Sequence, residues 1–174
     1  MAYESMHSLG PNGDSQTVGY YDLVDSAWVA PEITLVDSLG AGAEILYGRE
    51  LIAHTAEYFG PQGILGQTTN GMNCQNCHLD AGTRPWGNNY SAVFSTYPKF
   101  RERSATVETI TKRVNDCFVR SLNGLLLDTN SREMRAILAY IQWLGQGVGK
   151  GVKPVGAGLE DIPFLNRPAN PQAG

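Results

Sequence analysis

A five-residue string near the middle of the chain, Cys74-Gln75-Asn76-Cys77-His78, limits the possible folds more than any other feature of the sequence. Its spacing is that of the attachment motif for c-type haem. The two thiols of such a motif add to the two vinyl groups of haem, and the adjacent imidazole is then placed to bind the iron axially. The string therefore predicts one covalent haem c, attached through Cys74 and Cys77, with His78 as an iron ligand.

Other uses of paired cysteines fit the sequence less well. A structural zinc site needs a second pair of Cys or His ligands, and Cys117, His7 and His54 do not form a pair at that spacing. A thioredoxin-like redox motif lies in a βαβ pattern, whereas the periodicity of this chain is helical. The cysteine count is three, and an odd count disfavours a pure disulfide framework.

Composition excludes several further classes of protein. With 42% apolar and 17% charged residues, the chain is too apolar and too weakly charged to be disordered. No run approaches the ~18 consecutive apolar residues of a transmembrane helix, so no membrane span is predicted. A net charge of −4 disfavours general nucleic-acid binding.

The charges are divided unevenly along the chain. Residues 1–60 hold nine acidic residues and one basic residue, whereas residues 61–174 hold eight acidic and twelve basic residues. One interpretation is a solvated acidic N-terminal extension. The other is that the second part presents a basic site to an anion.

Apolar periodicity predicts three helices and therefore a mostly α fold. The first is expected over residues 43–59, the second over 105–122 and the third over 131–144. The Gly60-Pro61 pair ends the first helix, and Asn130 is the expected N-cap of the third, with Glu133 as its capping-box partner. Residues 61–104 are expected to be a loop region that carries the haem motif.

The order of these elements suggests a class I-like cytochrome c domain, in which the first and last helices cross beside the haem. We expect this domain to span residues 39–148. An N-terminal extension (1–38) precedes it, and a Gly- and Pro-rich tail or interdomain linker (149–174) follows.

The second axial ligand of the iron is open to several residues. Methionine is usual in electron-transfer cytochromes, but Met72 is too close to Cys74 to reach the opposite haem face. Met134 falls on the apolar stripe of the third helix, where a core position is expected. His54 lies within the first predicted helix, where an ordinary surface or core histidine is expected.

Cys117 is the one thiol left after haem attachment. Arg113 and Ser121 lie four residues before and after it, so all three share one helical face. Cys117 can be a small buried hydrophobe, and the upstream run of Lys99, Arg101 and Arg103 can be a solvated surface. Alternatively, a cationic pocket around a thiolate lowers the thiol pKa and attracts small anions. Replacing Lys150 or Lys153, in the tail, is expected to have little effect on such an anion site.

Three segments resemble the N-terminal haem domain of the bacterial thiosulfate dehydrogenases, which are tetrathionate-forming periplasmic enzymes distantly similar to the SoxA cytochromes. They read Asn-Cys-His-Leu-Asp-Ala-Gly (76–82), Tyr-Pro-Lys-Phe-Arg-Glu-Arg (97–103) and Arg-Val-Asn-Asp-Cys-Phe-Val-Arg-Ser (113–121). The resemblance covers about residues 40–160. It implies that His78 and Cys117 are the axial iron ligands and that Cys117 is the catalytic sulfur. It also implies that Arg103, Arg113 and Ser121 hold the substrate.

The resemblance further implies oxidation of thiosulfate to tetrathionate in the periplasm. Met1 to Tyr20 is polar and Gly-rich, so a signal peptide is expected to have been removed. The usual enzyme has a second haem domain, whereas this sequence holds one Cys-x-x-Cys-His, so electrons are expected to pass to a separate cytochrome or a second haem domain. Two alternatives remain: an electron carrier or sensor whose haem is tuned by Cys117, and a SoxA-like sulfur-oxidation subunit.

Overall fold

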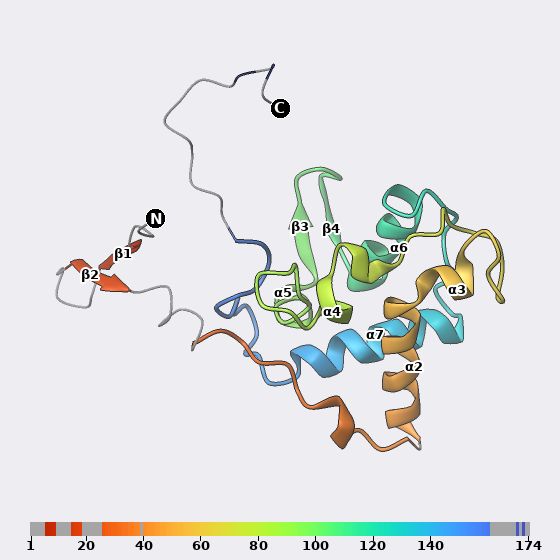
Figure 1. Ribbon diagram of the computed structural model, residues 1–174, viewed down its shortest axis with the longest axis horizontal. Coiled ribbons are helices and arrows are strands. Elements are labelled where there is room, and N and C mark those ends of the chain that lie inside the picture. Colours follow the sequence, from red (N-terminus) through yellow and green to blue (C-terminus); the bar gives the residue numbers. More distant parts are fainter. Residues whose placement is uncertain are drawn as a thin grey trace.

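A computed structural model of the chain describes residues 6–9, 15–18, 26–38, 40–160, 170 and 172. In these residues the fold is mostly α, as predicted (Figure 1). The helices are α2 (Ala41–Ala53), α3 (Thr55–Phe59), α4 (Leu79–Gly82), α5 (Val93–Thr96), α6 (Ile110–Arg120) and α7 (Arg132–Gly145), with 3₁₀ turns η1 (Ile33–Leu35) and η2 (Cys74–Asn76). Two antiparallel hairpins pair β1 (Met6–Leu9) with β2 (Ser15–Val18), and β3 (Lys99–Arg101) with β4 (Thr106–Glu108). None of the described helices has the length and apolar character needed to cross a bilayer.

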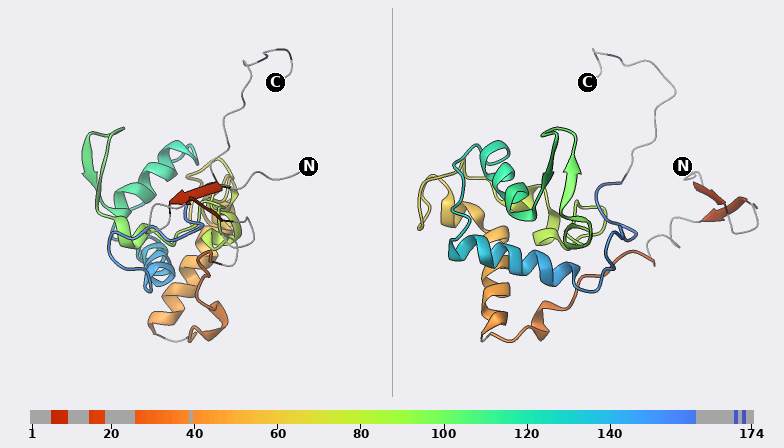
Figure 2. Two further views of the ribbon diagram at one scale, coloured as in Figure 1. Left: turned by 90° about the vertical axis from the view of Figure 1, so that its left-hand side faces the viewer. Right: turned by 180° about the vertical axis from the view of Figure 1, so that it is seen from behind.

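The core is organised around the crossing of α2 and α7, which form the most extensive contact between any two elements (Figures 1 and 2). The predicted crossing of the first and last helices is thereby found. At Gly48 the backbones meet closely, because a Cβ there would lie 2.0 Å from the carbonyl oxygen of Ala136. The crossing buries Leu51, Ile52, Ile137, Tyr140 and Ile141.

The single helix predicted over residues 43–59 is two helices. The chain breaks at His54, where φ is −123° and ψ is 36°. The break frees the carbonyl of Ala53, which accepts a hydrogen bond from Gln75 Nε2 at 2.7 Å. It also frees the amide of Ala56, which donates to Asn73 Oδ1 at 2.8 Å. Periodicity does not show this break because both helices contribute to one core.

The helix predicted over residues 105–122 is also shorter than expected. Residues 106–108 are strand β4, and α6 begins only after Thr109, whose side chain accepts a hydrogen bond from the amide of Lys112 at 3.2 Å. Val107, which fitted the helical pattern, is 66% exposed on the strand. Figure 2 shows the β3–β4 hairpin projecting from the body beside α6.

The third helix begins one residue later than predicted. Ser131, not Asn130, is the N-cap of α7, and its hydroxyl accepts a hydrogen bond from the amide of Met134 at 3.1 Å. Glu133 is not a capping-box partner, and its carboxylate instead accepts a hydrogen bond from the Tyr47 hydroxyl at 3.3 Å.

Segments on either side of the helices pack against them. Trp28, Ala30 and Ile33 contact the core, and the Trp28 amide donates to the carbonyl of Val155 at 2.9 Å. Residues 150–158, called the strap below, lie against α5 and the 86–89 loop through backbone hydrogen bonds. The proposed division into extension, domain and tail stays a prediction.

Candidate functional site

A cavity of about 350 Å³ gathers most of the residues that the sequence singled out. All three cysteines and His78 line it, together with Arg113 of α6 and Ser121, the residue that caps the C-terminus of this helix. Much of the wall is apolar and comes from α2, α5, α6 and α7, through residues Ile52, Val93, Val114, Phe118, Ile137 and Ile141. The fold therefore joins the haem motif to the face of α6 that carries Cys117.

The broken helix α2–α3 positions the cysteine loop. The amide of Cys74 donates to Thr55 Oγ1 at 3.0 Å, and the Thr55 hydroxyl in turn donates to the carbonyl of Leu51 at 2.7 Å. The Asn73 amide donates to Asn76 Oδ1 at 2.7 Å and closes the η2 turn. These bonds fix the thiol-bearing backbone against the core from which the cavity wall is built.

His78 is held from two sides. Its Nδ1 lies 2.6 Å from the carbonyl oxygen of Asn88, which can only accept, so Nδ1 is the protonated donor and Nε2 keeps its lone pair. The ring stacks on Tyr90 with centroids 4.4 Å apart. Burial, helped by the charge of Arg113, lowers the pKa of His78 and favours the neutral ring that binds metal. Gly82 makes room for Tyr90, because a Cβ at this left-handed position would lie 2.0 Å from the Tyr90 ring.

These residues fit a covalently bound haem c. The three thiols are free of disulfides, two of them precede an oriented neutral imidazole, and apolar side chains enclose the cavity beside them. Cys74 and Cys77 would carry the thioether bonds, and His78 would supply one axial ligand. Cys117 of α6 lines the same cavity, and its sulfur could supply a second ligand.

The surroundings of Cys117 differ from the expected activated thiol. Burial raises the pKa of the Cys117 thiol, and the charge of Arg113 and a hydrogen bond with Ser121 only partly offset this effect. Of the two interpretations of this region, a cationic pocket that lowers the thiol pKa is therefore not found for the free Cys117 thiol. Its shared face with Arg113 and Ser121 is found as predicted.

Four cationic side chains line the cavity: Lys99, Arg101, Arg113 and Lys153. Within the described residues, neither Asp nor Glu lines it. Lys99 and Arg101 alternate on β3 with Phe100, which is 60% exposed. Arg103 is exposed in the turn after β3 and is not part of the lining, so the structure does not bring it to Cys117. Lys153 also lies in the lining, although the sequence predicts little effect from its replacement.

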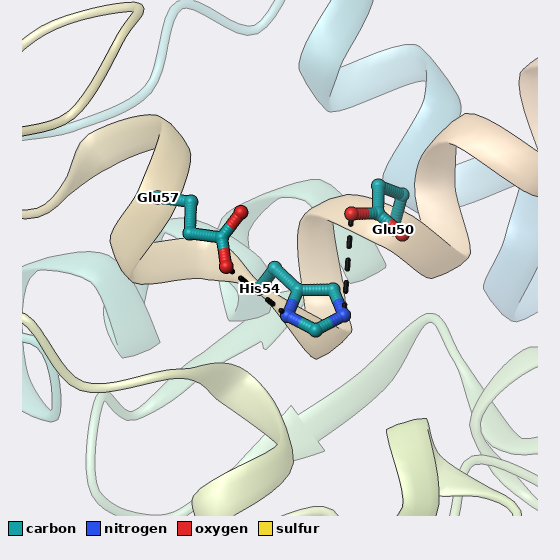
Figure 3. A group of neighbouring side chains, drawn as sticks. All are labelled: Glu50, His54 and Glu57. Atoms are coloured by element: carbon teal, nitrogen blue, oxygen red, sulfur yellow. Dashed lines mark ion pairs between the residues drawn. The ribbon is translucent and has the colours of Figure 1, made fainter.

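The other candidate ligands occupy different places. Met72 lines the cavity but is 40% exposed, whereas Met134 is completely buried in the core and outside the lining. His54 is also outside it. Figure 3 shows the His54 ring between two carboxylates, with Nε2 4.0 Å from Glu50 and Nδ1 3.6 Å from Glu57. One ligand atom from each of these three side chains lies within 4.8 Å of the others, a spacing that could hold a metal ion, and the carboxylates form ion pairs with the ring when it is protonated.

Sequence reasoning missed several supporting residues. Asn88 acts through its backbone carbonyl, which leaves no signal in residue type. Thr55 looks like an ordinary helical residue until the break at His54 is known. Lys153 depends on the path of the strap, which local patterns do not determine.

Part of the chain matches a described family of proteins. Residues 66–149 match the family model for the SoxA/TsdA cytochrome c domain. The chain is 37% identical over 121 residues to the thiosulfate dehydrogenase of Psychrobacter arcticus. The aligned region covers 70% of this chain and 36% of that protein. It is 29% identical over 146 residues to the thiosulfate dehydrogenase of Allochromatium vinosum. That alignment covers 82% of this chain and 52% of that protein.

A solved structure is similar over most of the chain. The thiosulfate dehydrogenase (TsdBA) of Marichromatium purpuratum, in its "as isolated" form, superposes with a TM-score of 0.70 at 26% identity. The match covers 85% of this chain and 32% of that one. The chain spans between about a third and a half of the length of the curated relatives that it matches.

Proposed function

The chain carries a cytochrome c domain of the SoxA/TsdA family in residues 66–149, and from this premise we propose that it oxidises thiosulfate to tetrathionate. The observation that carries the proposal is the meeting of Cys117, Arg113 and Ser121 with the haem motif on one cavity lined by four cations. A cytochrome c domain implies haem c. Relatives named thiosulfate dehydrogenase support the choice of substrate.

The residues of the cavity suit the chemistry of two like-charged substrates. Joining two thiosulfate dianions forms one sulfur–sulfur bond and releases two electrons, with no proton gained or lost. Bound haem c supplies an iron that accepts electrons one at a time. Arg113 donates charge-assisted hydrogen bonds that offset the repulsion between the dianions, and Ser121 offers a further donor. Cys117 supplies the sulfur beside which thiosulfate is held.

We infer one haem for this chain, with His78 and Cys117 as its axial ligands, and a periplasmic location. The two electrons leave for an external acceptor, either a second haem domain or a separate cytochrome. Arg103, which the resemblance points to as a substrate-holding residue, is retained as a candidate. Its place in the hairpin turn makes Arg101 the nearer cation to the cavity.

The proposal is tested by thiosulfate-dependent reduction of ferricyanide by the haem-loaded chain, with a separate haem domain supplied as acceptor in a parallel assay. We expect two ferricyanide ions reduced for each tetrathionate formed. Arg113→Ala should lower kcat/KM for thiosulfate by about one to two powers of ten, because a charged hydrogen bond contributes about 1.5–3 kcal/mol. Arg120→Ala, an exposed arginine on the same helix, is the matched control and should change little.

Two results would contradict the proposal. Wild-type activity in Arg113→Ala would show that Arg113 does not hold the substrate anion. No thiosulfate-dependent reduction in either assay would favour an electron carrier or sensor whose haem is only tuned by Cys117.

A further inference from the structure

The cavity carries more positive charge than the candidate substrate residues account for. Lys99, Arg101 and Lys153 line it in addition to Arg113. In the part of the chain that the structure describes, none of these four makes an ion pair with a carboxylate, because the ion pairs found involve His54, Lys112 and Arg132. Unpaired cations around an apolar cavity favour an anionic ligand.

We propose that Lys153, carried to the cavity by the strap, is a further anion-holding residue that helps to position the sulfur oxoanion beside Cys117. The inference rests on the proposed function and extends it. It assigns a binding residue outside the segment 66–149 that matches the family, so it concerns a feature that the family match does not cover.

Hydrogen bonds on both sides of Lys153 hold the strap in place. Before it, the Gly151 amide donates to the Ser95 carbonyl at 2.8 Å, and the Ser95 hydroxyl donates to the Val152 carbonyl at 2.6 Å. After it, the amide of Trp86 and the side-chain amide of Asn89 both donate to the carbonyl of Gly156, each at 2.7 Å. Lys153 therefore extends from a backbone anchored at both ends.

The strap is also joined to the haem motif. The Asn88 amide donates to the Gly158 carbonyl at 2.8 Å, while the Asn88 carbonyl accepts from His78. One peptide segment thus contacts both the strap and the predicted iron ligand. This link joins the strap to His78, on the same cavity that Cys117 lines.

The charges of the other three cations affect the pKa of Lys99. Burial lowers the pKa of Lys99, and the charges of Arg101, Arg113 and Lys153 lower it further. Lys153 is therefore close enough to Lys99 to disfavour its protonated form. An anion placed among these groups relieves their mutual repulsion, so each cation contributes to the free energy of anion binding.

The experiment measures the affinity of the oxidised, haem-loaded full chain for sulfate, a dianion that is not oxidised, by titration calorimetry at low ionic strength. The KM and kcat for thiosulfate are measured in parallel. We expect Lys153→Gln to weaken sulfate binding and raise the KM by about five- to tenfold with kcat nearly unchanged, a smaller effect than for Arg113 because Lys153 is exposed to solvent, which weakens its interaction with the anion. Lys153→Arg should restore both. Arg84→Gln, an exposed arginine outside the lining, should match the wild type.

The haem carboxylates are the other anion that these cations can serve. Lys153→Gln with unchanged sulfate affinity and a shifted haem midpoint potential would overturn the proposal in favour of that role. Equal loss in Lys153→Gln and Lys153→Arg, with a lowered Tm, would overturn it in favour of a structural one. Because sulfate binding needs no turnover, a wild-type chain that binds sulfate through Lys153 but does not oxidise thiosulfate would contradict the proposed function alone.

Discussion

At the scale of single residues, the cavity is lined by three thiols and an imidazole together with four cationic side chains. The Cys74–His78 motif, Arg113 and Ser121 could be predicted because each depends on spacing along one loop or one helix turn. Arg103 and Lys153 could not be placed, since their distance from Cys117 is set by a hairpin and by the strap. Charge runs in a sequence do not tell which members of the run share a face.

The hairpin provides a direct comparison of two arginines. Arg101 lines the cavity, whereas Arg103 is exposed in the turn. We predict that Arg101→Ala lowers kcat/KM for thiosulfate by about tenfold, since a tenfold change corresponds to about 1.4 kcal/mol. Arg103→Ala should lower it by less than about twofold. Steady-state kinetics of the two variants measure both losses of kcat/KM. A larger loss in Arg103→Ala than in Arg101→Ala would show that the turn closes over the substrate.

At the scale of elements, the helices were largely predictable and their interruptions were not. Apolar periodicity found the helical face of α7 because Met134, Ile137, Ile141 and Leu144 are all buried. It missed the break at His54, because hydrogen bonds to the distant cysteine loop stabilise that break. It also missed the strand before α6, because that strand depends on pairing with β3. Tertiary contacts decide such boundaries.

The α2–α7 crossing predicts a steric cost at Gly48. Alanine there would place its Cβ 2.0 Å from the carbonyl oxygen of Ala136, so the helices must separate. Gly48→Ala is expected to lower the free energy of unfolding by about 1–3 kcal/mol and Tm by about 3–10 °C. Gly147→Ala, which adds a Cβ with no atom within 4 Å, is the control for thermal unfolding. Equal Tm values for the two variants would contradict the close crossing.

The start of α6 predicts a pH-dependent contribution to stability. The pKa of the buried Glu108 carboxyl is lowered from 4.5 by hydrogen bonds from Ser104 and from Lys112, whose Nζ lies 2.9 Å from the carboxylate. A carboxylate with a lowered pKa stabilises the fold above its unfolded pKa and loses this contribution as pH falls through the folded value. The Tm difference between wild type and Glu108→Gln should therefore be present above pH 4.5 and disappear as pH falls below it.

The matched variant for this measurement is Glu102→Gln, in the exposed turn of the same hairpin. It has no ion pair among the described residues, so its Tm should follow that of the wild type across the same pH range. A difference between Glu108→Gln and wild type that persists unchanged into acid would contradict the charged pair.

At the scale of the whole molecule, segments that are distant in the sequence line or support one cavity. The broken helix α2–α3 fixes the cysteine loop, the 86–89 loop orients His78, α6 brings Cys117, and the strap adds Lys153. The mostly α class could be predicted from periodicity and the haem motif together. The path of the strap could not, because Gly- and Pro-rich segments carry no periodicity from which to place them.

Electron paramagnetic resonance of the oxidised, haem-loaded chain tests most directly whether Cys117 is the second iron ligand, opposite His78. We predict a low-spin signal of thiolate type in the wild type and its replacement by that of another ligand set in Cys117→Ala. Retention of the covalent haem in acidified solvent shows that Cys74 and Cys77 still hold it in both proteins. An unchanged signal in Cys117→Ala would contradict this prediction and assign the second ligand to another residue.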